Sequence, residues 1–394
     1  MKIIWLSNYN FSAYKNIIPF TRKDFPFHPS TWIVNLASIL SKDESVELHI
    51  VTVSPYIKAD FEFTADNIHF HILKYSFPFS TRGFPDKMPL DILSQYSTVI
   101  SKFIRYINII RPDIIHAHGT EYLYGLVGIK SKFPLLISIQ GVVASIYKTD
   151  PSFRFFLQTK IERKTILKNR FFACRTEFDK NHIRSLNKNA VIFTLHEAIN
   201  PCFFTSQWKA EKKQTLLFVG SIIERKGIFT LLQSMIVVKS LFPEVFLHIV
   251  GDGNPKYING LKQFCLVNNI DKHICFEGSK TPNEILKYQI DSQVFILPSY
   301  CENSPNSIAE AMVVGMPVIG SNVGGIPSMI TDNVNGLLFD YTDYKELAAK
   351  IILLLGDINL RTSLGASARI MAESKYLPLN VASSVIKAYT EIIG

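Results

Sequence analysis

The 394-residue sequence lacks several features that would assign it to a membrane, a disulfide framework or nucleic acid. No apolar run approaches the roughly 18 residues that a membrane-spanning helix needs, although 47% of the residues are hydrophobic. The five cysteines are scattered, with no Cys-x-x-Cys pair, which fits a reduced cytoplasmic compartment. Residues 1–10 predict a first strand rather than a signal peptide. No nucleic-acid-binding signature is present, so nucleic acid is not expected as a partner.

Charge is sparse and unevenly placed. Charged residues make up 19% of the chain, and the net charge is +9. Residues 1–200 hold 25 Lys and Arg against 16 Asp and Glu, whereas residues 201–394 hold 17 of each, so the first half carries the whole excess. Two interpretations stay open. The excess is either an ordinary solvated surface, or it attracts the first half to an anionic membrane face or an acidic substrate.

Apolar strand candidates alternate with helix candidates along the whole chain, which predicts an α/β class with parallel βαβ units. In the first half we predict strands over 2–7, 46–53, 68–75, 113–118, 135–140, 171–174 and 191–194, and helices over 30–40, 90–110 and 150–170. In the second half we predict strands over 215–220, 245–251, 274–278, 294–298, 317–320 and 336–340. Helices are expected to begin near residues 227, 256, 282 and 304, and closing helices to span 344–355, 360–375 and 379–393.

This rhythm predicts two doubly wound, Rossmann-like domains with parallel sheets. The first covers residues 1–200, a linker with Pro201 and a charged run covers 201–213, and the second covers 214–376. Ligands of such sheets bind at the carboxyl ends of the strands, so we expect a cleft between those edges of the two domains.

The stretch from Ser299 to Met312 carries the most informative residues. It joins a strand candidate to a predicted helix, with Ser304 as the N-cap and Pro305 at the first helical position. Glu302 precedes this cap, and Glu310 lies roughly 9 Å further along the helix axis, which suits two anchors on an elongated ligand. The N-terminus of this helix favours a phosphate between the two carboxylates. This N-terminus comprises Ser304, Pro305, Asn306 and Ser307.

A second candidate phosphate site is the loop from Gly220 to Gly227, which follows a strand and opens a helix. Lys226 at the helix start would place a cation and backbone N–H groups on a phosphate, although an exposed turn lysine is the simpler alternative. The loop is not a Walker motif. Further strand ends carry Gly251, Gly253, Phe276 and Glu277, where glycines permit close ligand approach or serve only as turn residues.

Taken in order, these motifs resemble the retaining glycosyltransferases of family 4, which have the GT-B fold. The resemblance rests on Glu302-x7-Glu310, the loop ending in Lys226-Gly227, and Asn322-Val-Gly-Gly325. It implies a nucleotide-sugar donor, with uridine favoured over guanosine as the base, bound without a metal or cofactor. Lys226 would hold the diphosphate, Glu310 the ribose and Glu302 the donor sugar. The strand-end loops with Gly251, Gly253, Phe276 and Glu277 would line the nucleobase pocket.

This sequence departs from the family pattern at two positions. Family members often carry an Arg at the position of Ser221, and Arg225 either compensates for it or points to solvent. Gln140 stands where many relatives have a His close to the transferred sugar. Gln can donate a hydrogen bond to a sugar hydroxyl but cannot carry a protonic charge.

The resemblance also implies that the helix over 377–394 would cross back onto the first domain.

Two histidine pairs have i, i+2 spacing on strands, so each pair points to one face of its strand. His116 and His118 end a first-domain strand, and they suit a polar role at the ligand site, a structural role, or a metal site for which no third ligand is apparent. We include His118 with Gln140, Glu302 and Lys226 among the candidate catalytic residues. His69 and His71 are assigned a structural role, and no metal site is predicted.

Residues 151–172 form a basic amphipathic segment. Phe153, Phe155 and Phe156 interleave with cations that include Arg154 and Lys160. Such a helix lies either on an anionic bilayer or, as an ordinary surface helix, with its apolar face in the core.

The resemblance to family 4 implies a retaining, hexosyltransferase-type enzyme that moves a sugar from a nucleotide-sugar to a glycan or lipid-linked acceptor. We expect it in bacterial-type surface polysaccharide biosynthesis, such as lipopolysaccharide or capsule, in the cytoplasm and peripheral to the inner face of the membrane. Two alternatives stay open. One is a degenerate GT-B protein that binds nucleotide or a partner without transfer, and the other is a nucleotide-sugar epimerase.

Overall fold

The structure is a computed structural model that describes residues 1–21, 31–75, 90–120, 122–209, 211 and 213–394. The chain forms two compact units. Unit 1 comprises Met1–Ala198 with Pro378–Gly394, and unit 2 comprises Ile199–Leu377. Across the described residues, no helix is both long and apolar enough to cross a membrane.

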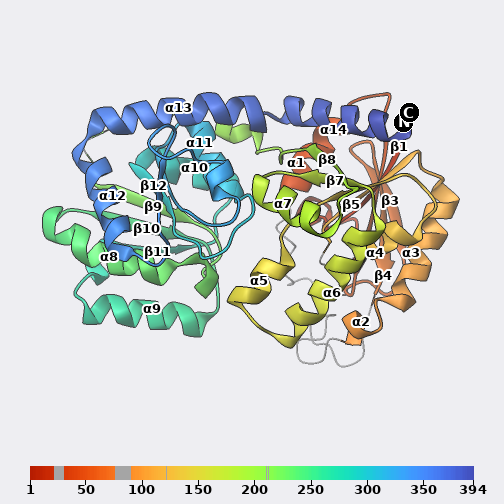
Figure 1. The fold of residues 1–394 in the computed structure, drawn as a ribbon, viewed down its shortest axis with the longest axis horizontal. Coiled ribbons are helices and arrows are strands. Elements are labelled where there is room, and N and C mark those ends of the chain that lie inside the picture. Colours follow the sequence, from red (N-terminus) through yellow and green to blue (C-terminus); the bar gives the residue numbers. More distant parts are fainter. Residues whose placement is uncertain (22–30, 76–89, 121, 210, 212) are drawn as a thin grey trace. The chain divides into compact units, whose positions relative to one another are not determined.

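Unit 1 is built on an eight-stranded sheet in the order β3-β4-β2-β1-β5-β6-β7-β8 (Figure 1). Its described strand pairs are parallel except β3 with β4, which is antiparallel. The strands are β1 (Lys2–Leu6), β2 (Glu47–Ser54), β3 (Phe61–Ala65), β4 (Ile68–Lys74), β5 (Ile114–His118), β6 (Leu135–Ser138), β7 (Phe171–Cys174) and β8 (Val191–Thr194).

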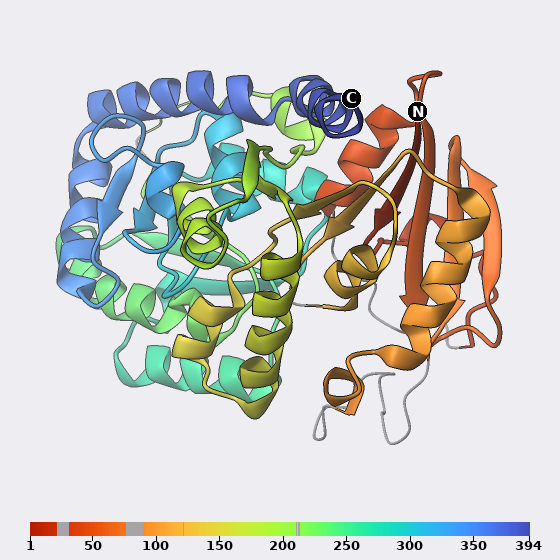
Figure 2. The same ribbon diagram turned by 45° about the vertical axis from the view of Figure 1, so that its right-hand side comes forward.

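Both faces of this sheet are buried, because successive side chains of each strand point to opposite faces. In β1, Ile4 and Leu6 enter one apolar core, while Ile3 and Trp5 enter the other. The helices are α1 (Thr31–Leu40), α2 (Leu90–Leu93), α3 (Ser97–Ile110), α4 (Leu123–Lys130), α5 (Val143–Thr149), α6 (Phe153–Lys168), α7 (Glu177–Leu186) and α14 (Pro378–Ile393) (Figure 2).

Helix α14 joins unit 1 although it is the last helix of the chain. It packs against α1, and its buried Tyr389 lies in a hydrogen-bonded chain. The Trp5 indole N–H donates to the Tyr389 hydroxyl at 2.8 Å, and that hydroxyl lies 2.6 Å from His116 Nδ1. His116 Nε2 lies 2.6 Å from the Ser138 hydroxyl. Both His116 nitrogens are therefore used to hold β1, β5, β6 and α14 together.

Unit 2 is a second doubly wound unit, with a six-stranded sheet in the order β11-β10-β9-β12-β13-β14. Its described strand pairs are all parallel. The strands are β9 (Thr215–Val219), β10 (Phe246–Val250), β11 (Ile274–Gly278), β12 (Val294–Leu297), β13 (Val318–Ser321) and β14 (Leu337–Phe339). The helices are α8 (Ile228–Leu241), α9 (Pro255–Val267), α10 (Pro282–Asp291), α11 (Asn306–Val314), α12 (Tyr344–Gly356) and α13 (Ile358–Tyr376).

Some expectations about secondary structure were wrong. The single helix predicted over 90–110 is two helices, α2 and α3, because Gln95 and Tyr96 adopt left-handed φ values of 48° and 53° between them. The antiparallel edge strand β3 was not predicted. Helix α4 was also missed, since six of its eight residues are buried and it shows no helical alternation of apolar and polar positions.

Candidate functional site

The carboxyl ends of β9 and β10 meet through backbone contacts that only glycine permits. Gly251 has a φ of 143°, and a Cβ there would lie 1.9 Å from the Gly220 carbonyl oxygen. A Cβ on Gly253 would lie 2.0 Å from the Ile222 carbonyl oxygen. The Gly251 N–H also donates to the Gly278 carbonyl at 2.9 Å. The predicted glycines after β9 and β10 thus lie together, packed backbone on backbone, at one sheet edge.

The loop after β9 is also fastened to the loop after β12. Gly227 has a φ of 68°, and a Cβ there would lie 1.9 Å from the Pro298 carbonyl oxygen. The Tyr300 N–H donates to the Arg225 carbonyl at 2.8 Å, and Arg225 Nη1 donates to the Cys301 carbonyl at 2.7 Å. Arg225 therefore turns toward the loop after β12 rather than to solvent. Ser221, at the position of the family arginine, is exposed.

This docking brings together two residues that sequence reasoning had placed in separate motifs. Lys226 Nζ forms an ion pair with Glu302 Oε1 at 2.5 Å, and Arg225 Nη1 lies 3.7 Å from the same oxygen. The Lys226 and Glu302 side chains are 15% and 9% exposed, so the pair is largely removed from solvent. A Cβ on Gly324 would lie 1.9 Å from the Glu302 carbonyl oxygen, so the turn after β13 packs directly against the Glu302 backbone.

Helix α11 begins one residue later than predicted. Pro305, with an extended φ, ψ of −72°, 118°, occupies the N-cap position, and no side chain caps the helix. The Ser304 hydroxyl contacts Met329 Sδ at 3.8 Å instead of capping. Asn306 and Ser307 form the first helical positions. The predicted stop at Gly315 is confirmed, since its φ is 85° and its N–H donates to the last turn.

Glu310 lies in the second turn of α11, and the residue as a whole is half-buried. Within the described part of the chain, this carboxyl group makes no hydrogen bond or ion pair. Burial raises its pKa from 4.5 to about 8, because the charged form loses hydration without gaining a partner. Its carboxyl group raises the pKa of nearby Cys202, though less than burial does, to about 11. Glu310 is therefore a polar group that lacks a partner from the described residues.

Phe276 and Glu277 lie on β11 and are half-buried. Glu277 Oε1 lies 2.8 Å from His248 Nδ1. Burial alone would raise the pKa of Glu277, but hydrogen bonds from His248, Tyr288 and Cys275 outweigh it and lower the pKa. Lys262 Nζ lies 5.6 Å from the Phe276 ring centroid. Sequence reasoning missed His248, whose only signal was a polar position within an otherwise apolar strand.

In unit 1, His118 and Gln140 line one pocket together with Arg175 and Glu197. His118 Nε2 is buried and has no hydrogen-bond partner among the described residues. Burial and the nearby charges hold the pKa of His118 well below 6.5, so the ring is neutral. Arg175 pairs with Glu197 and donates from Nη2 to the Gln140 carbonyl at 2.7 Å. Neither Arg175 nor Glu197 was singled out from the sequence, because nothing near them forms a motif.

Comparison with known proteins identifies the part of the chain that holds the unit 2 site. Residues 203–371 match the family Glycosyl transferases group 1. This segment is a glycosyl transferases group 1 domain. It contains every candidate residue of unit 2, from Gly220 to Glu310.

Relatives and solved structures extend the likeness to the whole chain. An uncharacterized glycosyltransferase of Methanocaldococcus jannaschii is 24% identical over 366 residues, which cover 91% of this chain and 94% of that protein. Sucrose-phosphate synthase from Thermosynechococcus elongatus superposes with a TM-score of 0.80 at 18% identity, covering 100% of this chain and 99% of that chain. HepE of Anabaena, solved in complex with UDP-glucose, gives a TM-score of 0.72 at 13% identity, with 99% and 100% covered. The predicted two-domain α/β GT-B fold is confirmed.

The raised pKa of Glu310 predicts a pH-dependent cost in stability. Below pH 4.5 the carboxyl group is protonated in both folded and unfolded chains, so it costs nothing. Between pH 4.5 and about 8 the unfolded chain ionises first, and the folded state loses relative stability. Glu310→Gln should therefore melt higher than the unmodified protein, with a difference that grows from pH 5 to 8 and then levels off.

Melting temperatures across this pH range check the prediction. Glu244→Gln is the matched control, because Glu244 is an exposed unit 2 carboxylate and should give a flat difference. A pH-independent difference for Glu310→Gln would contradict the assigned environment of Glu310.

Proposed function

We propose that the chain is a retaining glycosyltransferase of family 4 that takes a sugar from a UDP-sugar. The observation that carries the proposal is the contact of Lys226 with Glu302 beside the start of α11. Further along that helix lies Glu310, which has no partner among the described residues. This arrangement offers a cation and a helix N-terminus for a diphosphate, flanked by two carboxyl groups for hydroxyls. HepE, which shares the fold, has been solved with UDP-glucose bound, and this supports a uridine donor.

The proposed roles follow from what each group can do. Lys226 would exchange Glu302 for the donor diphosphate and stabilise the negative charge that develops as the sugar–phosphate bond breaks. Glu302 would then accept hydrogen bonds from donor sugar hydroxyls, and Glu310 from the ribose hydroxyls. Arg225, 3.7 Å from Glu302, would supply part of the charge that Ser221 cannot. Fixed cations and helix N–H groups would make a divalent metal unnecessary for this step.

Unit 1 would bind the acceptor. Its pocket presents neutral His118 and Gln140, beside the Arg175–Glu197 ion pair. These groups can hydrogen-bond sugar hydroxyls. We propose a front-side mechanism, in which the acceptor attacks from the side of the leaving phosphate. The departing phosphate then takes the acceptor proton, so no general base is needed from this pocket.

Relatives support a polysaccharide or lipid-linked acceptor. A capsular polysaccharide biosynthesis glycosyltransferase of Staphylococcus aureus is 28% identical over 167 residues, covering 40% of this chain and 41% of that protein. WaaG, a glycosyltransferase involved in lipopolysaccharide biosynthesis, superposes over the whole chain with a TM-score of 0.70 at 15% identity. We therefore place the proposed reaction in surface polysaccharide biosynthesis.

A thermal-shift panel of UDP, GDP, ADP and their common sugars tests the donor site. At a hundredfold excess over its dissociation constant, UDP should stabilise the protein by about 2.7 kcal/mol. Glu310→Ala should weaken UDP binding about two- to tenfold, since a hydrogen bond to an uncharged group contributes about 0.5–1.5 kcal/mol. Glu244→Ala, at the exposed control position, should leave the shift unchanged. A panel without any shift would contradict nucleotide-sugar binding and favour a protein that binds some other partner.

We also propose that unit 1 docks peripherally on an anionic membrane through α6. On this helix the exposed fraction is 61% for Phe153, 39% for Phe156 and 51% for Leu167. Lys160 Nζ lies 5.0 Å from the Phe156 ring centroid. An apolar edge with adjacent cations suits the boundary between headgroups and acyl chains. The net charge of the first 200 residues would add electrostatic attraction.

Vesicle flotation tests the membrane proposal. The protein should float with vesicles that contain anionic lipid at low salt, and much less at high salt. Phe153→Ser should weaken binding about tenfold, because burying a Phe side chain contributes about 1.5–3 kcal/mol. Ile370→Ser is the control, since Ile370 is an exposed apolar residue of unit 2. Absence of flotation at low salt, or equal loss in both variants, would contradict docking through α6.

A further inference from the structure

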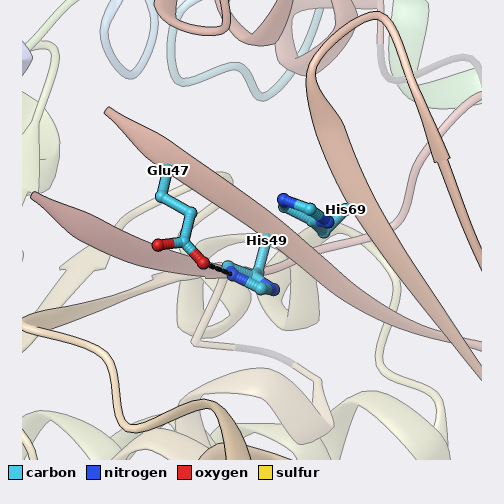
Figure 3. A group of neighbouring side chains, drawn as sticks. All are labelled: Glu47, His49 and His69. Atoms are coloured by element: carbon cyan, nitrogen blue, oxygen red, sulfur yellow. Dashed lines mark hydrogen bonds and ion pairs between the residues drawn. The ribbon is translucent and has the colours of Figure 1, made fainter. Parts of the chain in front are cut away.

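A cluster of histidines and carboxylates lies on β2, β3 and β4 of unit 1, apart from the residues discussed above. His49 on β2 and His69 on β4 are direct partners in the parallel register. Glu47 lies two residues before His49, so both side chains point to the same face. Figure 3 shows Glu47, His49 and His69 gathered there. Each offers one ligand atom, and these atoms all lie within 4.8 Å of one another.

His71 and Glu62 extend this cluster into a chain with three polar contacts. Glu62 Oε2 lies 3.2 Å from His71 Nδ1. His71 Nε2 lies 3.0 Å from His49 Nδ1, and His49 Nε2 lies 2.9 Å from Glu47 Oε1. Two neutral imidazoles carry two N–H groups, which serve the two contacts of His49. His71 Nδ1, which faces Glu62, has no hydrogen-bond partner among the described residues.

We propose that Glu47, His49 and His69 bind a divalent transition-metal ion of the Zn²⁺ class. An ion on His49 Nε2 and Glu47 would take the place of the proton between those two groups. His49 Nδ1–H would then donate to His71 Nε2, and His71 Nδ1–H to Glu62. A ligating histidine whose other nitrogen is oriented by a further hydrogen-bonded partner is the usual arrangement in metal sites. The His69 Nδ1 contact with the Thr64 hydroxyl, at 3.0 Å, orients the other ligating ring.

The ligand set selects the class of metal. Two imidazoles and one carboxylate suit Zn²⁺, Co²⁺, Ni²⁺ or Cu²⁺, whereas Mg²⁺ and Ca²⁺ prefer oxygen ligands. Tetrahedral Zn²⁺ with bonds of about 2.0–2.1 Å brings ligand atoms to about 3.3 Å from one another. The side chains must therefore close by about 1.5 Å from the separation of up to 4.8 Å. Glu47 is exposed and able to move. To bind the ion it must break its ion pair with Lys2, whose Nζ lies 3.1 Å from Glu47 Oε1.

Such an ion would tie β2 to β4 within unit 1. None of its ligands lines the His118 pocket or belongs to unit 2, so the ion has no part in the proposed transfer step. Its role would be to hold the sheet together near the antiparallel β3–β4 pair.

Equilibrium dialysis of the full chain against Zn²⁺, after chelator treatment, tests the proposal. The unmodified protein should bind one Zn²⁺ more per chain than His69→Ala, and the ion should raise its melting temperature. Mg²⁺ should do neither. His182→Ala is the matched control, because His182 also pairs with a carboxylate of unit 1, Glu162, at 3.2 Å. It should retain the zinc.

Two further variants separate a metal site from a loss of folding. Glu62→Gln changes an exposed residue outside the ligand set and should weaken zinc binding about 10–100-fold through His71. Lys2→Met removes the competing cation and should strengthen binding. Melting of each metal-free variant at the unmodified temperature verifies folding. Absence of stoichiometric zinc in the unmodified protein, or zinc that persists in His69→Ala and Glu47→Gln, would overturn the proposal.

Discussion

The contact on which the candidate site of unit 2 depends is the docking of the loop after β9 onto the loop after β12. Gly227 approaches the Pro298 carbonyl more closely than any side chain would permit, and the Arg225 backbone and guanidinium bond to Tyr300 and Cys301. Only this approach brings Lys226 within 2.5 Å of Glu302. The Lys226 ammonium and the Glu302 carboxylate, which come from separate motifs, therefore form a largely buried ion pair beside the first turn of α11.

This pair leaves each charge satisfied. An unpaired buried charge would cost about 3–5 kcal/mol, so Lys226 and Glu302 stabilise each other, and the proposed donor would have to replace both partners. Glu310 has no such partner in the described part of the chain, and burial raises its pKa instead. The two carboxylates of the motif therefore lie in different environments although they share one helix and the loop before it.

Much of the fold follows from hydrophobic patterning, whereas the contacts within the site do not. Buried strands such as β12 are continuous apolar runs. Glycines follow β9 and β10 directly. The break at Gln95 and Tyr96 and the N-cap at Pro305 depend on tertiary packing that no local pattern records. The Lys226–Glu302 contact joins residues 76 positions apart. The cluster of His49 and His69 arises from the register of β2 on β4, which is why His69 was assigned a structural role from spacing alone.

The measurement that tests the central claim most directly is calorimetric titration of UDP into the unmodified protein, Lys226→Met and Glu302→Gln. If Lys226 exchanges Glu302 for the diphosphate, Lys226→Met should weaken UDP binding at least tenfold. Glu302→Gln should bind UDP as tightly as the unmodified protein or more tightly, because the lysine no longer has to leave a carboxylate. Lys287→Met, at an exposed position of α10, should change nothing. Equal UDP affinity in Lys226→Met and the unmodified protein would contradict the account.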